Sequence, residues 1–313
     1  MLSFLAHGYI WAEGKEGITN ILPASLAVPW VQVSTHLDLP PVITYAGCVL
    51  YNFKLKDTKG PLVAENLEML TTFTDTRDEE WFYIGSLLVE IEAVKGLVGI
   101  EKAYEAMLSK DNQQLSRCLT EIHASIKSMA DALLRMKEEC KPGVFYQQIR
   151  LYFNGTDDRD VFPNGFFFVQ CLGPDSQLRV SYGGASAGQS STLPAFDAFF
   201  GVQQHESYFG EQMKYMPPEH RSFTKAISKQ PSVRQHIVDS ENTELAGKYN
   251  DCIKSIAAFR NRHFGLVKDY IIQQSRLQDP DSHAKGTGGT ENLEKLLQGA
   301  RENSENCLIK LQN

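Results

Sequence analysis

The sequence lacks the features that mark several large classes of protein. It has no run of about 18 apolar residues, because Glu90, Glu92 and Lys95 interrupt its most apolar stretch, so no segment is predicted to span a membrane. None of its 6 cysteines belongs to a C-x-x-C pair, which argues against a cysteine zinc site or a redox couple. There is no basic run, and 31 basic against 38 acidic residues give a net charge of −7, which disfavours nucleic acid as a partner. The N-terminus also lacks the basic region of a signal peptide, so we expect a cytoplasmic protein with reduced thiols.

The composition is that of a folded chain. Its 313 residues are 42% hydrophobic and 22% charged, which is close to globular averages and sufficient for about two domains. No βαβ alternation and no internal repeat is visible, so we predict a mainly α fold. We expect a small, loop-rich domain over residues 1–75, with extended pieces at VPWVQV and PPVITYAGCVL, and a large helical domain over 76–313.

Helical periodicity dominates the rest of the chain. Between residues 111 and 140 the apolar side chains recur at three-and-four spacing and define one buried face. The stretch from 154 to 191 differs, being rich in Gly, Pro, Asp and Ser with short β-like pieces GFFFVQCL and LRVSY. Further helices are predicted over 79–94, 100–108, 145–153, 193–204, 221–228, 232–238, 244–273 and from 290 onward.

One stretch, GGASAGQSS at residues 183–191, contains the G-x-S-x-G pattern of a nucleophile elbow. Ser186 would be the nucleophile, with Asp197 and His263 following in the chain order of α/β hydrolases. That site requires a central parallel sheet, for which this sequence has no strands, so a serine hydrolase is a remote alternative. A flexible connection or a loop that lines a ligand are the other interpretations.

Arg260 and His263 lie one turn apart on the apolar stripe of the helix predicted over 244–273. A lone histidine on such a stripe is usually a core residue, but a buried guanidinium beside it requires an anionic partner. Haem would provide a partner for both side chains, because its iron binds a neutral imidazole and its propionates bind a guanidinium. The glycine-rich KGTGGT, residues 285–290, is not a P-loop; it is either a hinge or a loop that presents backbone N–H groups to a carboxylate.

The order of several longer stretches resembles the indoleamine 2,3-dioxygenase family, haem enzymes that open the indole ring of tryptophan. The stretches are PWVQVSTHLDLPPVITYAGCVL, FYIGSLLVEIEA, SAGQSS-x4-FD, YMPPEHRSF, PSVR, AAFRNRHF and AKGTGGT, and together they span nearly the whole chain. The family normally carries a further helical segment ahead of the position that matches Met1. The resemblance implies heme b as cofactor and O2 and tryptophan or another indoleamine as substrates.

The resemblance also implies roles for individual residues. His263 would be the proximal ligand of the haem iron, Arg260 would contact the propionates and Asp197 would orient Arg260. The distal pocket would be formed by Tyr45, Cys48, Phe82, Tyr83, Ser86, Ser186, Ala187 and Gly188, and the substrate would be covered by Gly286, Thr287 and Gly288.

One expected substrate contact lies just before Tyr215 of the YMPP motif. Two residues before this tyrosine, where the resemblance implies an arginine for the substrate carboxylate, the chain has Met213, and Lys214 is next. The expected aromatic residue of the pocket falls on Tyr208, or on Phe209 after a one-residue shift. We therefore expect a monomeric dioxygenase that forms N-formylkynurenine, and the alternative is a haem protein that binds O2 without turnover, like the molluscan myoglobins related to the family.

Overall fold

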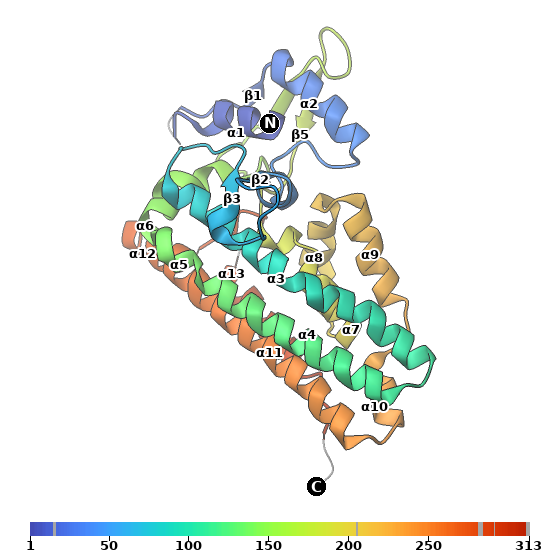
Figure 1. Cartoon of the computed structure of the whole chain (residues 1–313). Coiled ribbons are helices and arrows are strands. Elements are labelled where there is room, and N and C mark those ends of the chain that lie inside the picture. The colour runs from blue at the N-terminus through green and yellow to red at the C-terminus, as the bar shows by residue number, and fades with distance from the viewer. Residues whose placement is uncertain (15–16, 205, 281–283, 291, 311–313) are drawn as a thin grey trace.

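The computed structural model describes residues 1–14, 17–204, 206–280, 284–290 and 292–310 (Figure 1). As predicted, the fold is mainly α. The α-helices are α1 (Leu2–Trp11), α2 (Ala24–His36), α3 (Arg77–Leu108), α4 (Asn112–Leu134), α5 (Met136–Glu139), α6 (Pro142–Val144), α7 (Thr192–Phe200), α8 (Glu206–Gln212), α9 (Pro218–Ser228), α10 (Val233–Asp239), α11 (Thr243–Val267), α12 (Gln273–Gln278) and α13 (Leu293–Glu305). The strands are β1 (Ile21–Leu22), β2 (Phe53–Leu55), β3 (Leu67–Met69), β4 (Phe166–Val169) and β5 (Gln177–Val180).

Shorter helical turns connect these elements. Three are π-helical, η1 (Ala46–Leu50), η3 (Phe145–Ile149) and η7 (Lys268–Ile272), and four are 3₁₀ turns, η2 (Ala64–Asn66), η4 (Arg150–Phe153), η5 (Ala187–Gln189) and η6 (Met213–Tyr215). The helix expected over 145–153 is thus a π turn followed by a 3₁₀ turn. The two helices expected over 79–94 and 100–108 are one continuous helix, α3.

Three long helices, α3, α4 and α11, form the body of the molecule, with α4 packed between the other two (Figure 1). Each begins at a polar side chain that accepts a hydrogen bond from a backbone N–H group of the first turn. The caps are Thr76 for α3, Asp111 for α4 and Asn242 for α11. The apolar stripe predicted between 111 and 140 is buried, which confirms that face of α4.

The close packing of α3 on α4 depends on two glycines of α3. A Cβ atom at Gly96 would lie 2.8 Å from Ser125 Oγ and from Phe196 Cζ, and one at Gly99 would lie 2.9 Å from Ile122 Cγ1. The Ser125 hydroxyl also accepts a hydrogen bond from the Gly96 N–H group at 3.1 Å. These contacts bring α7, which carries Phe196, against the α3–α4 pair.

The prediction of extended segments near the N-terminus is wrong. VPWVQV lies inside α2 although Pro29 is within that helix, and AGCVL of the second piece is the π turn η1. Proline costs a helix one hydrogen bond, but α2 buries Trp30 against Phe168, with ring centroids 5.7 Å apart. Tertiary burial therefore overrides the local preference.

A small mixed sheet joins the N-terminal elements to a segment from the middle of the chain. β1 pairs in parallel with β4, and β4 pairs antiparallel with β5, so both short β-like pieces expected between 154 and 191 are strands. A separate apolar core forms here from Ala6, Ile10, Trp11, Leu22, Ala27, Trp30, Phe162, Phe166, Phe168 and Val180. The small unit thus includes residues beyond 160, and the boundary at residue 75 stays a prediction.

Candidate functional site

The stripe predicted on α11 is largely buried, and it carries both residues proposed to hold haem. Arg260 is 7% exposed, whereas His263, one turn further, is half-buried. The apolar members of the stripe that are buried with Arg260 are Tyr249, Cys252, Ile253, Ile256 and Val267.

Arg260 is held by two residues from other helices. Its Nη2 atom donates to both carboxylate oxygens of Asp197 on α7, at 2.8 and 2.6 Å, and its Nη1 atom donates to the hydroxyl of Ser304 on α13. Asp197 is 6% exposed and Ser304 is fully buried, so the ion pair is desolvated. This arrangement locks α7, α11 and α13 together one turn away from His263.

The imidazole of His263 has no hydrogen-bond partner among the described residues. Burial, and then the positive charge of Arg260, lower its pKa to about 4, so the ring is neutral at pH 7 and a nitrogen lone pair is available. No group of three or more His, Cys, Asp or Glu side chains that could hold a bare metal ion exists in the described part of the chain. A single free imidazole suits a metal whose other ligands come from a macrocycle, so the donor set fits haem.

His7 shows what a core histidine looks like in the same chain. Burial lowers its pKa to about 4, as for His263, but both of its ring nitrogens are used. Nδ1 lies 2.9 Å from the carbonyl of Tyr152, and Nε2 accepts from the N–H of Ile43 at 3.0 Å. The contrast supports a ligand role for His263 rather than a packing role.

The loop 183–188 is tied to the segment around Tyr45 by one buried side chain. Gln189 Oε1 accepts from the Tyr45 N–H group at 2.9 Å, and Gln189 Nε2 donates to the carbonyl of Gly184 at 2.8 Å. The hydroxyl of Tyr45 donates to Glu90 on α3. Glu90 also accepts from Ser190 and Thr192 at the start of α7, at 2.7 and 2.6 Å. The structure thus brings Tyr45 and the Ser186–Gly188 loop to the same side of α3.

The predicted distal residues on α3 face an aromatic cluster. The ring of Phe82 lies 4.5 Å from Phe145 and 5.5 Å from Phe153, between centroids. Ser86 donates its hydroxyl to the carbonyl of Phe82, and Tyr83 donates its hydroxyl to the fully buried carboxylate of Glu79. Phe145, which the sequence analysis did not single out, is therefore a member of this apolar wall.

Tyr45 and Cys48 cannot act as bases near neutral pH. Burial raises the pKa of the Cys48 thiol to about 12, and burial together with Glu90 raises the pKa of Tyr45 well above its usual value. Both groups therefore stay protonated near neutral pH.

The glycine-rich loop is closed against the 183–188 segment. Gly184 donates its N–H to the Thr287 carbonyl at 2.8 Å, and the Thr287 hydroxyl donates to the Ala185 carbonyl at 2.6 Å. Gln212 Nε2 donates to the Gly288 carbonyl at 2.9 Å. A Cβ atom at Gly288 would lie 2.8 Å from Ser186 Cβ, so glycine is required for this approach. The alternative interpretation of 285–290 as a simple hinge is not supported by these contacts.

The residues expected to contact the substrate near Tyr215 differ in their exposure and in their contacts. Lys214 is exposed and forms an ion pair with Glu211 at 2.7 Å, so its charge points to solvent and not into a pocket. Met213 is half-buried. Tyr208 does reach the loop, because its hydroxyl lies 3.4 Å from Ser186 Oγ.

A different arginine, Arg150, has the geometry that a carboxylate site needs. Its Nε atom is buried without a hydrogen-bond partner among the described residues, and its Nη2 atom donates to the carbonyl of Lys285 at 2.5 Å. Arg150 lines a cavity of about 870 Å³ together with Gly286 and Thr287. The sequence carried a usable signal, because Arg150 lies between Ile149 and Leu151 in the apolar stretch QQIRLYF.

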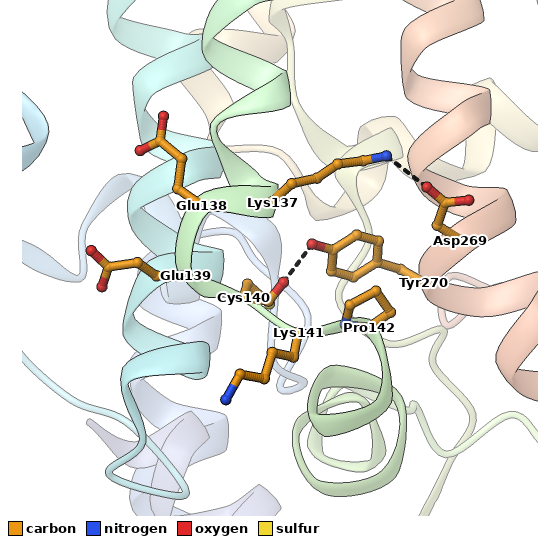
Figure 2. Close-up of a pocket in the computed structure, with 8 residues that line it drawn as sticks. All are labelled: Lys137, Glu138, Glu139, Cys140, Lys141, Pro142, Asp269 and Tyr270. Carbon is orange, nitrogen blue, oxygen red and sulfur yellow. Dashed lines mark hydrogen bonds and ion pairs between the residues drawn. The ribbon is translucent and has the colours of Figure 1, made fainter.

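A second, smaller cavity of about 200 Å³ lies where α5 meets η7 (Figure 2). Lys137 pairs with Asp269 at 2.6 Å, and Tyr270 donates its hydroxyl to the Cys140 carbonyl at 2.5 Å. Burial raises the pKa of the Cys140 thiol to about 12, so it is not a nucleophile. Glu138 and Glu139 pair with Arg135 and Arg77 outside the cavity, so most of its charged lining groups are already bound to protein partners.

The hydrolase alternative is wrong. The described strands form one three-stranded sheet of order β1-β4-β5 and one hairpin, with no central parallel sheet beneath Ser186. Asp197 binds Arg260 rather than a histidine, and the Ser186 hydroxyl accepts from the Gly188 N–H at 3.2 Å.

We accordingly expect no reaction of Ser186 with a fluorophosphonate probe, because no histidine or carboxylate among the described residues is hydrogen-bonded to its hydroxyl. Mass spectrometry of the probe-treated protein, with Ser186→Ala as the matched control, checks this. Rapid labelling of Ser186 in the parent alone would revive the hydrolase.

Comparison with known proteins gives one consistent family. A family model described as indoleamine 2,3-dioxygenase matches residues 1–307. The chain is 30% identical to indoleamine 2,3-dioxygenase 1 of Rattus norvegicus, over 98% of this chain and 78% of the relative. It is 34% identical to indoleamine 2,3-dioxygenase 2 of Homo sapiens, over 93% and 74%, and 32% identical to the indoleamine 2,3-dioxygenase of Saccharomyces cerevisiae, over 90% and 66%. None of the helices in the described residues is both long and apolar enough to cross a membrane.

Proposed function

This chain belongs to the indoleamine 2,3-dioxygenase family of haem-dependent enzymes, and from that premise we propose that it inserts both atoms of O2 into the indole ring of tryptophan or a related indoleamine. The product would be N-formylkynurenine. A cytoplasmic location and a monomeric state stay predictions.

The observation that carries the proposed substrate is the buried Nε atom of Arg150, which has no hydrogen-bond partner among the described residues, in a guanidinium that forms no ion pair with a described carboxylate. Burial lowers the pKa of this group, but an arginine remains charged at neutral pH. A desolvated cation without an anionic partner favours a ligand that brings a carboxylate. Tryptophan has one, and we assign its carboxylate to Arg150 in place of Met213 and Lys214.

The elements around Arg150 suit an indole ring. Phe153, in the same 3₁₀ turn as Arg150, stacks on Phe82, and Phe145 from the preceding π turn packs against Phe82 at a tilt. These ring contacts join the Arg150 turn to α3. Aromatic side chains of this kind provide an apolar wall against which a planar ring can lie, so the guanidinium can orient a substrate whose ring faces α3.

The closed loop 286–288 completes the proposed site. The loop contacts Gly184, Ala185 and Gln212 on one side, and Arg150 binds the adjoining Lys285 carbonyl on the other. A loop in this position excludes water from a bound substrate. Gly286, Thr287 and Gly288 would therefore cover the substrate, and Ser186, Ala187 and Gly188 would line the distal side.

His263 and Arg260 would hold the cofactor. When bound, haem supplies the activation of O2, which no side chain of the chain can provide. His263 would contribute a neutral imidazole to the iron, and the Asp197–Arg260–Ser304 contacts fix the turn of α11 that carries it. Because the guanidinium of Arg260 is already bound by Asp197, we assign Arg260 mainly to positioning His263, and its charge would attract the propionates.

Arg150→Leu tests the proposed function. A charge-assisted contact contributes about 1.5–3 kcal/mol, so the variant should raise the KM for tryptophan roughly ten- to a hundredfold. Lys214→Ala is the matched control, because its exposed charge should leave KM unchanged. Steady-state formation of N-formylkynurenine by both variants and the parent is the measurement. An unchanged KM in Arg150→Leu together with a raised one in Lys214→Ala would reverse the assignment.

A further inference from the structure

One face of α8 and of the turn η6 contacts both glycine-rich segments of the proposed site. It consists of Tyr208, Gln212 and Tyr215, which follow one another at helical spacing. The Tyr215 hydroxyl accepts a hydrogen bond from the Gly183 N–H group at 2.9 Å, and the Tyr208 hydroxyl lies 3.4 Å from Ser186 Oγ. Both tyrosines therefore contact the 183–188 segment.

Gln212, the middle residue of this face, contacts the 286–288 loop as well. Its Nε2 atom donates to the Gly288 carbonyl at 2.9 Å. A Cβ atom at Gly188 would lie 3.3 Å from Gln212 Cγ, and one at Gly288 would lie 3.1 Å from Gln212 Oε1. Gln212 is 2% exposed, so the two glycine-rich segments meet at one buried amide.

The amide of Gln212 uses only one of its two polar atoms. Its Oε1 atom is buried and has no hydrogen-bond partner among the described residues. In the closed loop this oxygen loses the hydrogen bonds that water would give it, and that loss opposes the gain from the Nε2 contact. The closed arrangement is therefore only weakly favoured at this side chain. A loop that admits a substrate and releases a product needs such a balance.

The hydrogen bonds of Thr287 join the loop to the 183–188 segment. Its carbonyl accepts from the Gly184 N–H group, and its hydroxyl donates to the Ala185 carbonyl. Gln212 adds a contact from a helix that belongs to neither segment. It makes that contact at Gly288, the next residue of the loop, which is buried.

We propose that Gln212 is a positioning residue, which holds the 286–288 loop closed over the site through the Gly288 carbonyl and does not touch the substrate. Its one hydrogen bond and its unpaired oxygen together set the population of the open loop. The inference rests on the proposed function for one consequence only, namely that an open loop releases tryptophan.

Trypsin cleavage after Lys285 measures opening of the loop without any substrate. Lys285 is exposed, whereas Gly288 is buried. A protease binds an extended segment on both sides of the bond that it cleaves, so Gly288 must leave Gln212 before cleavage. The rate of cleavage therefore reports the population of the open loop. Mass spectrometry of the fragment that begins at Gly286, released from the haem-loaded protein, is the measurement.

Gln212→Glu keeps the shape of the side chain but sets a carboxylate, which can only accept, against the Gly288 carbonyl. We expect cleavage after Lys285 to become about tenfold faster or more, because a buried charge without a donor costs more than a neutral group. Gln212→Asn is one methylene group too short to reach the carbonyl and should raise the rate about two- to tenfold, as for one neutral hydrogen bond. Gln212→Met removes the donor and the unpaired oxygen together, so it should change the rate less than Gln212→Glu does.

The order of these variants separates a positioning role from a packing role. A side chain that only fills space would tolerate Glu better than Met, because Glu has the shape of Gln. Ser125→Ala is the matched control for stability, since it removes a buried hydroxyl that accepts from the Gly96 N–H group in the α3–α4 contact. This variant should lower the free energy of unfolding and leave cleavage after Lys285 at the parent rate.

Protonation should reverse the effect of Gln212→Glu, because a neutral carboxyl group can donate to the Gly288 carbonyl as the amide does. The other titratable or charged groups near position 212 are Tyr208 and Tyr215, the surface pair Glu211–Lys214, and Asp157 beside Gly289. The parent is therefore titrated with tryptophan under the same conditions. We expect the Kd of Gln212→Glu to be about tenfold above the parent value at about pH 8 and to approach it at about pH 5.5.

A parental cleavage rate in both Gln212→Glu and Gln212→Asn would overturn the proposal, as would a larger effect of Gln212→Met than of Gln212→Glu. Faster cleavage with an unchanged Kd for tryptophan would confirm that Gln212 holds the loop and would show that the loop does not cover tryptophan. In that case the proposed function fails while the role of Gln212 in closing the loop stands.

Discussion

We expect His263→Ala to abolish haem binding and all turnover. The variant removes the one imidazole on the α11 stripe that has no hydrogen-bond partner among the described residues and that burial keeps neutral at pH 7. No group of three or more His, Cys, Asp or Glu side chains in the described chain could hold a bare iron instead. The ratio of haem to protein, from the absorption spectrum after reconstitution, is the measurement.

The matched control is His36→Ala, which removes an exposed histidine at the end of α2. It should bind haem as the parent does. Addition of free imidazole to His263→Ala should restore part of the haem spectrum, because the small ligand can occupy the space of the missing ring. A normal haem spectrum of His263→Ala without imidazole would show that the iron is held elsewhere.

Arg260→Leu lowers the free energy of unfolding by about 3–5 kcal/mol, the cost of leaving a buried carboxylate without its partner. Asp197 is 6% exposed and binds Arg260 through both oxygens, so it cannot find water when the guanidinium is lost. The double variant Arg260→Leu/Asp197→Leu should recover part of the loss because it removes the stranded charge. Urea unfolding of the parent, the single variant and the double variant measures the loss and its recovery. A loss below about 1 kcal/mol in the single variant would show that the ion pair is solvated.

The same variant should change the pH dependence of haem binding. Burial and the positive charge of Arg260 lower the pKa of His263 to about 4. Without that charge the pKa of His263 should rise, although burial still lowers it, so protonation competes with iron at a higher pH. We expect the midpoint of acid-induced haem release to move upward in Arg260→Leu, and by more than in a variant that loses the same stability at a site remote from His263.

Local periodicity was sufficient to predict the long helices, including the one that carries the proposed haem ligand. The stripe of α4, the stripe of α11 and the placement of Arg260 beside His263 follow from residues three or four apart, and polar caps at Thr76, Asp111 and Asn242 begin the long helices. Such features depend on neighbours in the chain. They therefore required no knowledge of the fold.

The tertiary structure decided which charges are paired and which remain available. The sequence alone does not distinguish Lys214 from Arg150 as a partner for a carboxylate. In the structure, Lys214 pairs with Glu211 at the surface, whereas Arg150 lines a cavity and its Nε atom has no partner among the described residues. The helix α2 forms around Pro29 only because Trp30 packs on Phe168, more than 130 positions later. The sequence by itself determined the mainly helical class and the His263 stripe, because both depend on residues close together in the chain. The groups proposed to face the substrate depended on contacts between distant segments. The free energy of burying a charge or a ring is set by the groups that the fold places beside it.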